Sequence, residues 1–343
     1  MTIKDILTSI NTNPMYDFLY NNEHLGNNII LIGLGGSYAY GTNVEGSDID
    51  IRGIALNSKR EILLGSGFEQ VHNEETDTVI YSFNKMIKLL TGCNPNTIEI
   101  LGLKPEHYIY LDPIGEKLLA NKKLFLSQRA AFTFGAYASS QLRRLDNKSA
   151  RVLTQSEQEA HILNSIKNAS EDYKRKYFSY TDDNIKLYTG PSQQEDYDTE
   201  IFMDLNLNNY PLRDWKNMWS EMNNIVKDYA KIGSRNAKAI EHNKLGKHMC
   251  HLIRLYMMCL DILENEEIVT YREKEHDLLM SLRNGEWLTD NKQPIPEFME
   301  LVKDYEKKLE YAKNNTSLPK QVDMKKIDDF VAEVNEQVVL RWF

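Results

Sequence analysis

Cysteine is scarce in this sequence, and so are long apolar runs. The three cysteines, Cys93, Cys250 and Cys259, include no Cys-x-x-Cys pair. Such a sparse, odd set argues against a disulfide framework or a zinc site and suits a reducing compartment. The longest uncharged stretch, residues 24–44, is rich in Asn, Gly, Ser and Tyr, and the first ten residues lack the apolar core of a signal peptide. These absences predict a cytoplasmic protein without a membrane segment.

Repeats and low-complexity segments are absent as well. Without a Gly-X-Y period, a heptad array or a short repeat, fibrous and solenoid architectures are excluded. The 343 residues are 41% hydrophobic and 27% charged, which is typical of a globular chain of about two domains. The 41 Lys and Arg against 50 Asp and Glu give a formal net charge of −9. A chain this acidic is no general nucleic-acid coat, so binding of nucleotide or nucleic acid requires a local basic patch.

Strand and helix signals are distributed unevenly along the chain. Runs that predict strands lie in the first third, at Ile29–Ile32, Asp48–Arg52, Phe68–His72 and Thr76–Phe83. Beyond about residue 115, helical periods dominate, at 115–145, 156–180, 213–232, 241–265, 296–313 and 323–340. The pattern predicts an α+β chain, with an α/β head over residues 1–120 and an α-helical domain over 121–343. An irregular insertion at about 181–212 interrupts the helices, and within it only Glu200–Met203 has strand character.

A glycine-rich turn follows the first predicted strand directly. Gly35 and Gly36 allow a sharp bend, and their N–H groups, together with the Ser37 hydroxyl, can donate to a phosphate. A helix that begins near Ser37 would add a favourable dipole. Most such turns are only turns, so this one is a weak indication by itself.

Two aspartates that follow the turn strengthen the phosphate hypothesis. Because residues two apart on a strand share a face, Asp48 and Asp50 would present carboxylates about 6–7 Å apart. Such a pair is costly unless a cation lies between the two, and Mg²⁺ accepts both carboxylate and phosphate oxygens. Arg52 shares that face and suits either a phosphate or an ion pair with one aspartate. The alternative is an exposed strand edge with solvated charges, but Ile49 and Ile51 can bury the opposite face.

The string GGSYAYGTNVEGSDIDIRGI, residues 35–54, resembles the DNA polymerase beta nucleotidyltransferase superfamily. Within it, the string is most similar to the bacterial and phage predicted nucleotidyltransferases that include RNA-ligase-associated polymerases. In that superfamily the GS turn holds the triphosphate, the DxD pair binds two metal ions, and a third acid lies on a neighbouring strand. The resemblance implies a small mixed-sheet, polymerase beta-like head. It also implies that Gly36 and Ser37 hold phosphate and that Asp48 and Asp50 bind two Mg²⁺ ions, for which Mn²⁺ can substitute.

The third acid has several candidates: Glu74, Glu75, Asp77 and Glu99. Asp77 opens a strand-like run that leads into a helix, which is where the resemblance places the last acid. We therefore predict Asp77 as the third catalytic metal ligand, the alternative being that it merely ends an acidic turn. Glu99 lies in a segment that resembles a family motif, NPxxxE, and is equally compatible with a first-turn helix acid that favours the helix dipole.

The segment 241–262 has an apolar stripe on one side and a basic stripe on the other. The apolar stripe comprises Met249, Leu252, Ile253, Tyr256, Met257 and Leu260. The basic stripe comprises Lys244, Lys247, His251 and Arg254. Positive groups in line repel one another unless an anion is near. The stripe therefore has two interpretations: it binds a nucleotide or an RNA backbone, or it is simply a solvated face.

The resemblance extends to this helix, whose KLGKHMCHLIRL is similar to a K…H..RL motif, and to Arg283–Gly285 and Ser317–Asp323. We predict that Lys247, His251 and Arg254 close over the nucleotide or the acceptor, and that Arg52 also binds the nucleotide. A second basic stretch, residues 122–151, has seven Lys or Arg and one acid and predicts an RNA-facing edge.

Taken together, these observations predict a metal-dependent nucleotidyltransferase. It would move a nucleoside monophosphate from a nucleoside triphosphate such as ATP to an acceptor and release pyrophosphate. An RNA 3′ end, in tRNA or in a nicked RNA, is the first candidate acceptor. A protein hydroxyl, as in nucleotidylating toxins or regulators, is an alternative. A non-catalytic nucleotide- or RNA-binding module is another, although the intact GGS and DID motifs argue against it.

Overall fold

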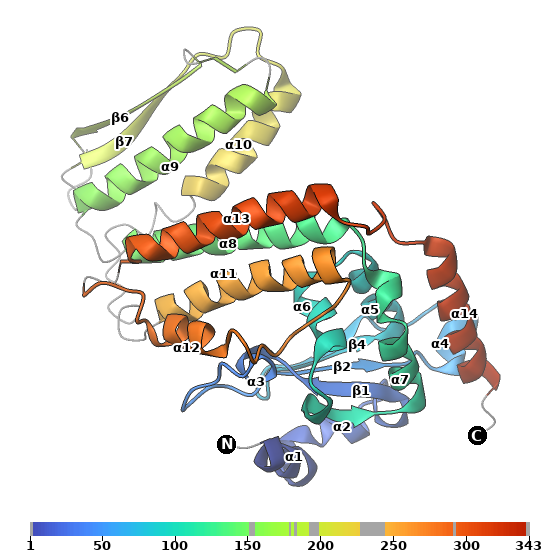
Figure 1. Cartoon of the computed structure of the whole chain (residues 1–343). Helices are drawn as coiled ribbons and strands as arrows, with labels where there is room; N and C mark the ends of the chain where they lie inside the picture. The colour runs from blue at the N-terminus through green and yellow to red at the C-terminus, as the bar shows by residue number, and fades with distance from the viewer. Residues whose placement is uncertain are drawn as a thin grey trace. The chain divides into compact units, whose positions relative to one another are not determined.

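The structure is a computed structural model of the chain (Figure 1). It describes residues 3–150, 155–177, 180–181, 184–191, 199–226, 244–290 and 293–340. Two compact units share the chain, the first comprising residues 1–142, 246–287 and 296–343 and the second 143–245 and 288–295. This division does not follow the boundary predicted near residue 120, because helices from the C-terminal half share one hydrophobic core with the α/β head.

A five-stranded mixed sheet lies at the centre of the first unit, in the order β3-β4-β2-β1-β5. The strands are β1 (Ile29–Leu34), β2 (Ile51–Ala55), β3 (Gln70–Asn73), β4 (Thr78–Ser82) and β5 (Tyr108–Leu111). Only β2 and β4 pair in parallel; the other pairs are antiparallel. The prediction of an α+β fold with a mixed sheet is confirmed.

Helices cover both faces of this sheet. One face packs on α1 (Ile3–Thr12) and α2 (Phe18–Asn21), in a cluster that joins Ile6, Ile10 and Leu19 to Ile32, Ile51 and Ile80. The opposite face packs on α5 (Phe83–Thr91), α6 (Pro95–Ile98), α7 (Pro113–Ala120) and α14 (Met324–Leu340). Figure 1 shows α5 and α6 across the sheet from α1 and α2. Because both faces are covered, β1 is apolar and buried along its whole length.

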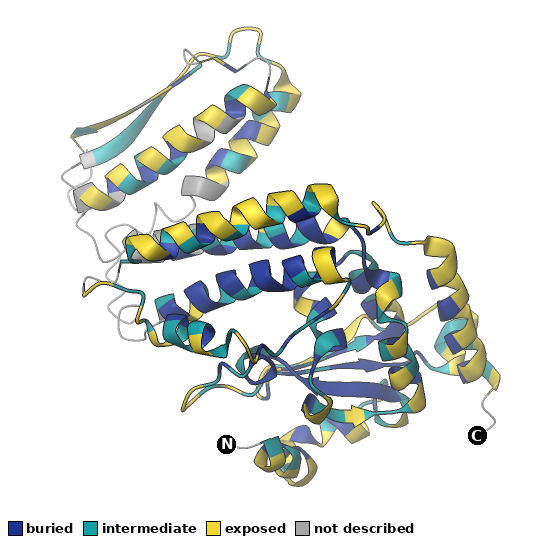
Figure 2. Ribbon diagram, in the orientation of Figure 1, coloured by how far each residue is buried: buried dark blue, intermediate teal, exposed yellow. Residues whose placement is uncertain are grey.

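The first unit contains further helices. They are α3 (Gly36–Tyr40), α4 (Lys59–Leu64), α11 (Lys244–Leu260), α12 (His276–Asn284), α13 (Pro296–Asn315) and the start of α8 (Arg129–Ala150). The predicted apolar stripe of α11 is buried, but Cys250, Leu255, Met258 and Cys259 are buried as well (Figure 2). A helix that is apolar on most sides belongs to a core, so α11 is no surface helix. It continues into a π-helical turn, Asp261–Asn265.

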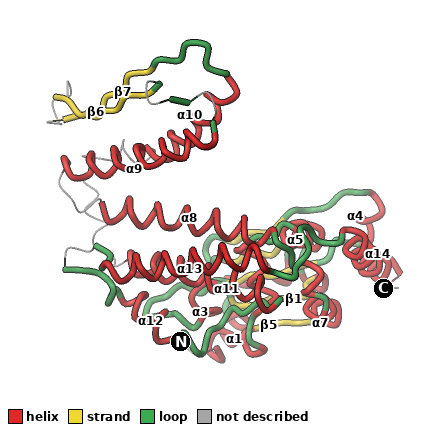
Figure 3. Tube along the Cα trace, turned by 45° about the horizontal axis from the view of Figure 1, so that its top comes forward, coloured by secondary structure: helices red, strands yellow, loops and turns green. Residues whose placement is uncertain are grey.

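The second unit pairs two helices with a hairpin. It contains α9 (Gln155–Lys176), α10 (Leu212–Val226) and the antiparallel strands β6 (Ile185–Pro191) and β7 (Thr199–Leu205) (Figure 3). The strand predicted at Glu200–Met203 is thus confirmed within β7. The segment around it, which we predicted to be an irregular insertion, also contains β6 and is therefore only partly irregular. The partner strand β6 escaped notice because it ends in Gly-Pro, a turn signal. Residues 227–243, which hold the ends of two predicted helices, lie outside the described residues.

Among the helices of the described ranges, none combines the length and the apolarity needed to cross a membrane. The predicted basic edge at 122–151 falls only partly within these ranges. Arg151 and the side chains of Arg143, Arg144 and Lys148 lie outside them, while Lys123 is exposed and pairs with Glu266.

Candidate active site

The glycine turn and the first aspartates meet at one end of the sheet. The short helix α3 begins directly after β1, and Gly36 has a positive φ of 51°. A Cβ atom at Gly36 would overlap Oδ2 of Asp50, and the Gly35 N–H donates to the Asp50 carbonyl at 2.8 Å. Only glycine allows the turn to approach this carboxylate so closely. The structure therefore brings together the predicted phosphate turn and the predicted metal ligand.

Asp48 and Asp50 lie just before β2 rather than on it. The prediction of a strand from Asp48 is wrong, since β2 begins at Ile51. The reason lies in the neighbouring strand: β4 begins at Thr78, opposite Ile51, because Asp77 leaves the extended conformation with a φ of 43°. Asp48 is exposed, whereas Asp50 is half-buried.

Arg52 holds Asp50 and Asp77 side by side. Its Nη2 lies 3.2 Å from Oδ1 of Asp50 and 3.2 Å from Oδ1 of Asp77. Its Nη1 donates to two carbonyl oxygens, that of Asp77 at 2.6 Å and that of Ile51 at 2.9 Å. Asp77 thus lies beside Asp50, in the turn before β4 rather than within the strand. Three of the predicted site residues form one cluster.

The charge of this cluster is unbalanced. Burial, a hydrogen bond to the Asp77 carboxyl group and the negative charge of Asp77 raise the pKa of Asp50 to about 6, although Arg52 and Lys247 oppose the shift. Two carboxylates held this close raise the pKa of one of them unless further positive charge is supplied. A perturbed acid of this kind marks a candidate functional site.

The donor set suits a hard divalent ion. Asp50 and Asp77 offer only carboxylate oxygens, the ligands that Mg²⁺ prefers, and their shared excess of negative charge favours a cation. No group of three His, Cys, Asp or Glu side chains within the described ranges is gathered tightly enough to hold a metal ion. The residues therefore fit a metal site by their chemistry, while ligation by the exposed Asp48 stays a prediction.

The basic residues of α11 divide into two environments. Lys247 is exposed and lies close enough to Asp50 for its charge to favour the ionised carboxyl group and so to oppose the rise of the Asp50 pKa. Arg254 is half-buried, with its Cζ atom 3.1 Å from the centroid of the Tyr40 ring and its Nη2 2.6 Å from Nδ1 of His251. The His251 ring in turn lies edge-on to Tyr137. The alternative of a solvated face therefore does not hold for Arg254 and His251, which lie against the rings of Tyr40 and Tyr137.

Glu99 belongs to this second environment. The Tyr40 hydroxyl donates to Oε2 of Glu99, and the Thr270 hydroxyl donates to the Glu99 carbonyl at 2.7 Å. Burial raises the pKa of Glu99, while the charge of Arg254 opposes the shift. Glu99, Tyr40 and Arg254 thus form a second cluster, which joins α3 to α11. Analysis of the sequence missed Tyr40, whose only signal is its place in the YAYG run after the glycine turn.

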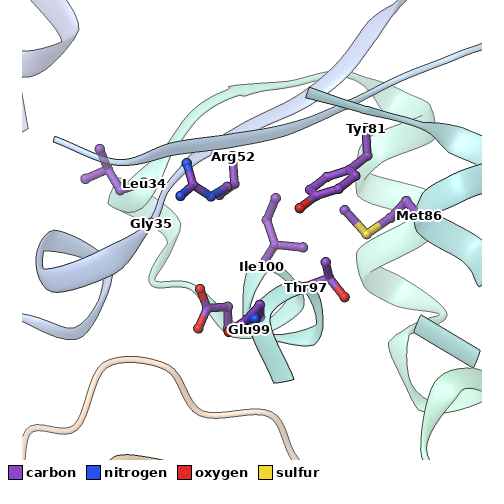
Figure 4. A pocket seen from close by; sticks show the side chains of 9 residues that line it. Leu34, Gly35, Arg52, Tyr81, Met86, Thr97, Glu99 and Ile100 are labelled. Atoms are coloured by element: carbon purple, nitrogen blue, oxygen red, sulfur yellow. The ribbon is translucent and has the colours of Figure 1, made fainter. Parts of the chain in front are cut away.

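A small pocket lies between the two clusters (Figure 4). Arg52 and Tyr81 border it from the strands, and Thr97 and Glu99 border it from the segment that follows α5. That segment is held by Asn94, which caps α6 by accepting a hydrogen bond from the Asn96 N–H at 3.0 Å. The NPNTIE segment therefore forms one wall of the candidate site.

The structure combines a mixed sheet, a glycine turn that lies against Asp50, and a further acid, Asp77, just before the adjacent strand β4. This combination is that of a polymerase beta-like nucleotidyltransferase. The comparison with known families agrees. The model of the RNA repair pathway DNA polymerase beta family (RlaP) matches residues 13–333, and the chain belongs to this family. Comparisons with curated proteins and with solved structures gave no match.

Proposed function

We propose that the protein is an Mg²⁺-dependent nucleotidyltransferase that adds a nucleoside monophosphate to an RNA 3′ end and releases pyrophosphate. The observation that carries this proposal is the approach of the glycine turn to Asp50, with Asp77 beside it. A glycine turn that can bind phosphate, next to a pair of carboxylates that can bind metal, suits nucleotidyl transfer. RNA is the preferred acceptor because the family description refers to RNA repair.

In this proposal each side chain has a distinct role. The N–H groups of Gly36 and Ser37, at the start of α3, donate to the triphosphate. Asp48, Asp50 and Asp77 are the metal ligands, and two bound Mg²⁺ ions would offset the charge on the α-phosphate and on the leaving pyrophosphate. The exposed Lys247 donates to phosphate oxygens from the α11 side.

The reaction needs one bond formed and one broken. The 3′-hydroxyl oxygen of the acceptor attacks the α-phosphorus, and the bond from that phosphorus to the oxygen that bridges to the β-phosphorus breaks. Pyrophosphate leaves with that bridging oxygen, and Asp77 receives the proton of the hydroxyl group before passing it to water. Catalysis is then chiefly positioning and charge neutralisation.

The structure supports different roles for the other predicted nucleotide ligands. Arg254 and His251 bind each other and lie against aromatic rings, so we propose that they position α3 through Tyr40 rather than contact the triphosphate. We also propose a cytoplasmic location, which suits three buried free cysteines.

A labelling experiment tests the proposal. The purified chain is incubated with Mg²⁺ and each α-³²P-labelled nucleoside triphosphate, with RNA that ends in a 3′-hydroxyl and with the same RNA ending in a 3′-phosphate. Label on the hydroxyl-ended RNA alone supports the proposal, and Asp50→Asn should abolish it. Label on the protein would indicate a protein acceptor, and label nowhere would indicate a non-catalytic binding module.

A further inference from the structure

Arg52 is engaged in an unusually complete set of contacts. Its Nη1 is fixed between two carbonyl oxygens, and its Nη2 lies between the Asp50 and Asp77 carboxylates. The side chain is 24% exposed, so the guanidinium group is partly withdrawn from water. Arginine presents its donors in a rigid planar fork, and here both ends of the fork are occupied. The side chain is therefore held in one position rather than sampling the solvent.

Arg52 also stabilises the unusual backbone of Asp77. Asp77 is one of the few non-glycine residues with positive φ, a conformation that costs free energy and persists where its surroundings enforce it. The Ile51 N–H donates to the Asp77 carbonyl at 3.2 Å, and Arg52 donates to that carbonyl and to the Asp77 side chain. Asp77 is thus turned towards Asp50 by contacts with Ile51 and Arg52.

The position of the guanidinium group is that of a cation shared by two carboxylates. This is the position in which a divalent ion would be most favourable, because both ligands already face it. A second cation placed there meets the repulsion of Arg52, which at about 4 Å and an effective dielectric constant near 20 is large compared with thermal energy. The negative charge of a triphosphate would offset that repulsion.

We infer that Arg52 is an internal counter-cation that occupies the space between Asp50 and Asp77 and keeps divalent metal from binding tightly until nucleotide arrives. The inference rests on the proposed function. Once triphosphate oxygens complete the ligand set, Nη2 releases the carboxylates, while Nη1 stays on its two carbonyls. Arg52 then remains beside Gly35 and within reach of a phosphate held by the glycine turn. Metal and nucleotide therefore bind as a unit.

A purely structural role for Arg52 makes the opposite prediction. If the guanidinium group served only to organise Asp50 and Asp77 for the metal, its removal would scatter the ligands and weaken metal binding. The sign of the change in metal affinity therefore separates the two roles. Metal affinity can be measured without turnover, so the test does not depend on knowing the acceptor.

The experiment is a calorimetric titration of the full chain with Mn²⁺ in the absence of nucleotide. Arg52→Gln should lower the dissociation constant about tenfold or more, because one repelling charge is removed. Arg52→Lys keeps that charge but cannot bond all four acceptors, and it should give a smaller decrease. Lys308→Gln is the matched control: it removes one charge from an exposed ion pair with Asp304 and should leave the dissociation constant unchanged. Thermal melting checks that each variant is folded.

A dissociation constant that is unchanged or higher in Arg52→Gln would overturn the inference. Should that variant fail to fold, an unchanged or higher value in Arg52→Lys would do the same. The labelling experiment keeps the two proposals apart. Tighter Mn²⁺ binding by Arg52→Gln without any transfer by the wild type would keep Arg52 as a counter-cation of Asp50 and Asp77, but it would remove the proposed function and with it the link to nucleotide binding. Transfer by the wild type, together with an Mn²⁺ affinity of Arg52→Gln no higher than that of the wild type, would remove only the inference.

Discussion

Two clusters in the first unit combine an arginine with acids, and they differ in what the arginine contacts. At the start of β2, Arg52 lies between the Asp50 and Asp77 carboxylates. Beside α3, Arg254 stacks on the ring of Tyr40, and it is the Tyr40 hydroxyl that donates to Glu99. The first cluster has two acids for one guanidinium group; the second balances one acid with one guanidinium group and satisfies the acid with a phenol.

We propose different tasks for the two clusters on the basis of this difference. An excess of negative charge beside the glycine turn suits a cation and costs stability without one. A balanced, aromatic cluster such as that of Glu99 holds elements together and requires no ligand. Residue types alone therefore do not separate an acid that shares an arginine with a second acid from one that is satisfied by a phenol; the neighbours of each acid do.

The largest expected effect comes from removing an acid of the first cluster. Asp50→Asn and Asp77→Asn should each lower the rate of nucleotide transfer at least about a hundredfold, since transition-state charge is no longer stabilised. The thermal midpoint without Mg²⁺ should stay the same or rise. Glu75→Gln is the control, because Glu75 is exposed in the turn that precedes β4. Retention of a tenth of the wild-type rate by either Asn variant would refute the assignment of that acid.

The next effect concerns Lys247, which faces the first cluster. Lys247→Ala should raise the KM for the nucleoside triphosphate about tenfold, because one charge-assisted contact contributes about 1.5–3 kcal/mol. As Lys247 is exposed, the free energy of unfolding should change by less than about 0.5 kcal/mol. Steady-state kinetics and urea denaturation provide the two measurements. An unchanged KM in Lys247→Ala would show that Lys247 of α11 does not contribute to nucleotide binding.

Arg254→Ala should show the reverse pattern. The variant loses the contact with Tyr40 and the hydrogen bond with His251, and the free energy of unfolding should fall by about 1–3 kcal/mol. Arg254→Lys, which keeps a positive charge but not the planar group, should recover only part of that loss. A large rise in KM with an unchanged free energy of unfolding would contradict this role and indicate that Arg254 binds the triphosphate.

The smallest effect is a pH dependence of stability. The pKa of Asp50 is about 6 in the folded chain against an ordinary value of 3.8, so the folded state binds the proton more tightly than the unfolded state does. The resulting stabilisation is fully present below about pH 3.8 and is lost as the pH rises through about 6. In metal-free buffer, the melting temperature of Asp50→Asn should therefore increase relative to that of the wild type as the pH rises from 4 to 7. A constant difference between the two melting temperatures across this range would show that folding does not raise the pKa of Asp50.

The sequence predicted well what depends on local pattern. Helices with a clear 3.6-residue period, such as α9 and α14, lie close to their predicted bounds, and the mixed sheet follows from short apolar or alternating runs. Of the strands that it missed, β5 is short and only partly buried, so its alternation is weak, and β6 ends in Gly-Pro, a turn signal. The family resemblance was equally local, because its glycine turn and its aspartates lie within residues 35–54.

What the sequence determined by itself was the inventory of the site: a glycine turn, paired aspartates, several further acids and a basic helix. Only the tertiary structure decided between Asp77 and Glu99 as the neighbour of Asp50, because that choice depends on strand pairing between β2 and β4 and on the packing of α3 against α11. It also placed Arg254 of the basic stripe against the ring of Tyr40. Helical periodicity states which residues share a side of a helix, but the element that covers that side is distant in the chain and comes into contact only on folding.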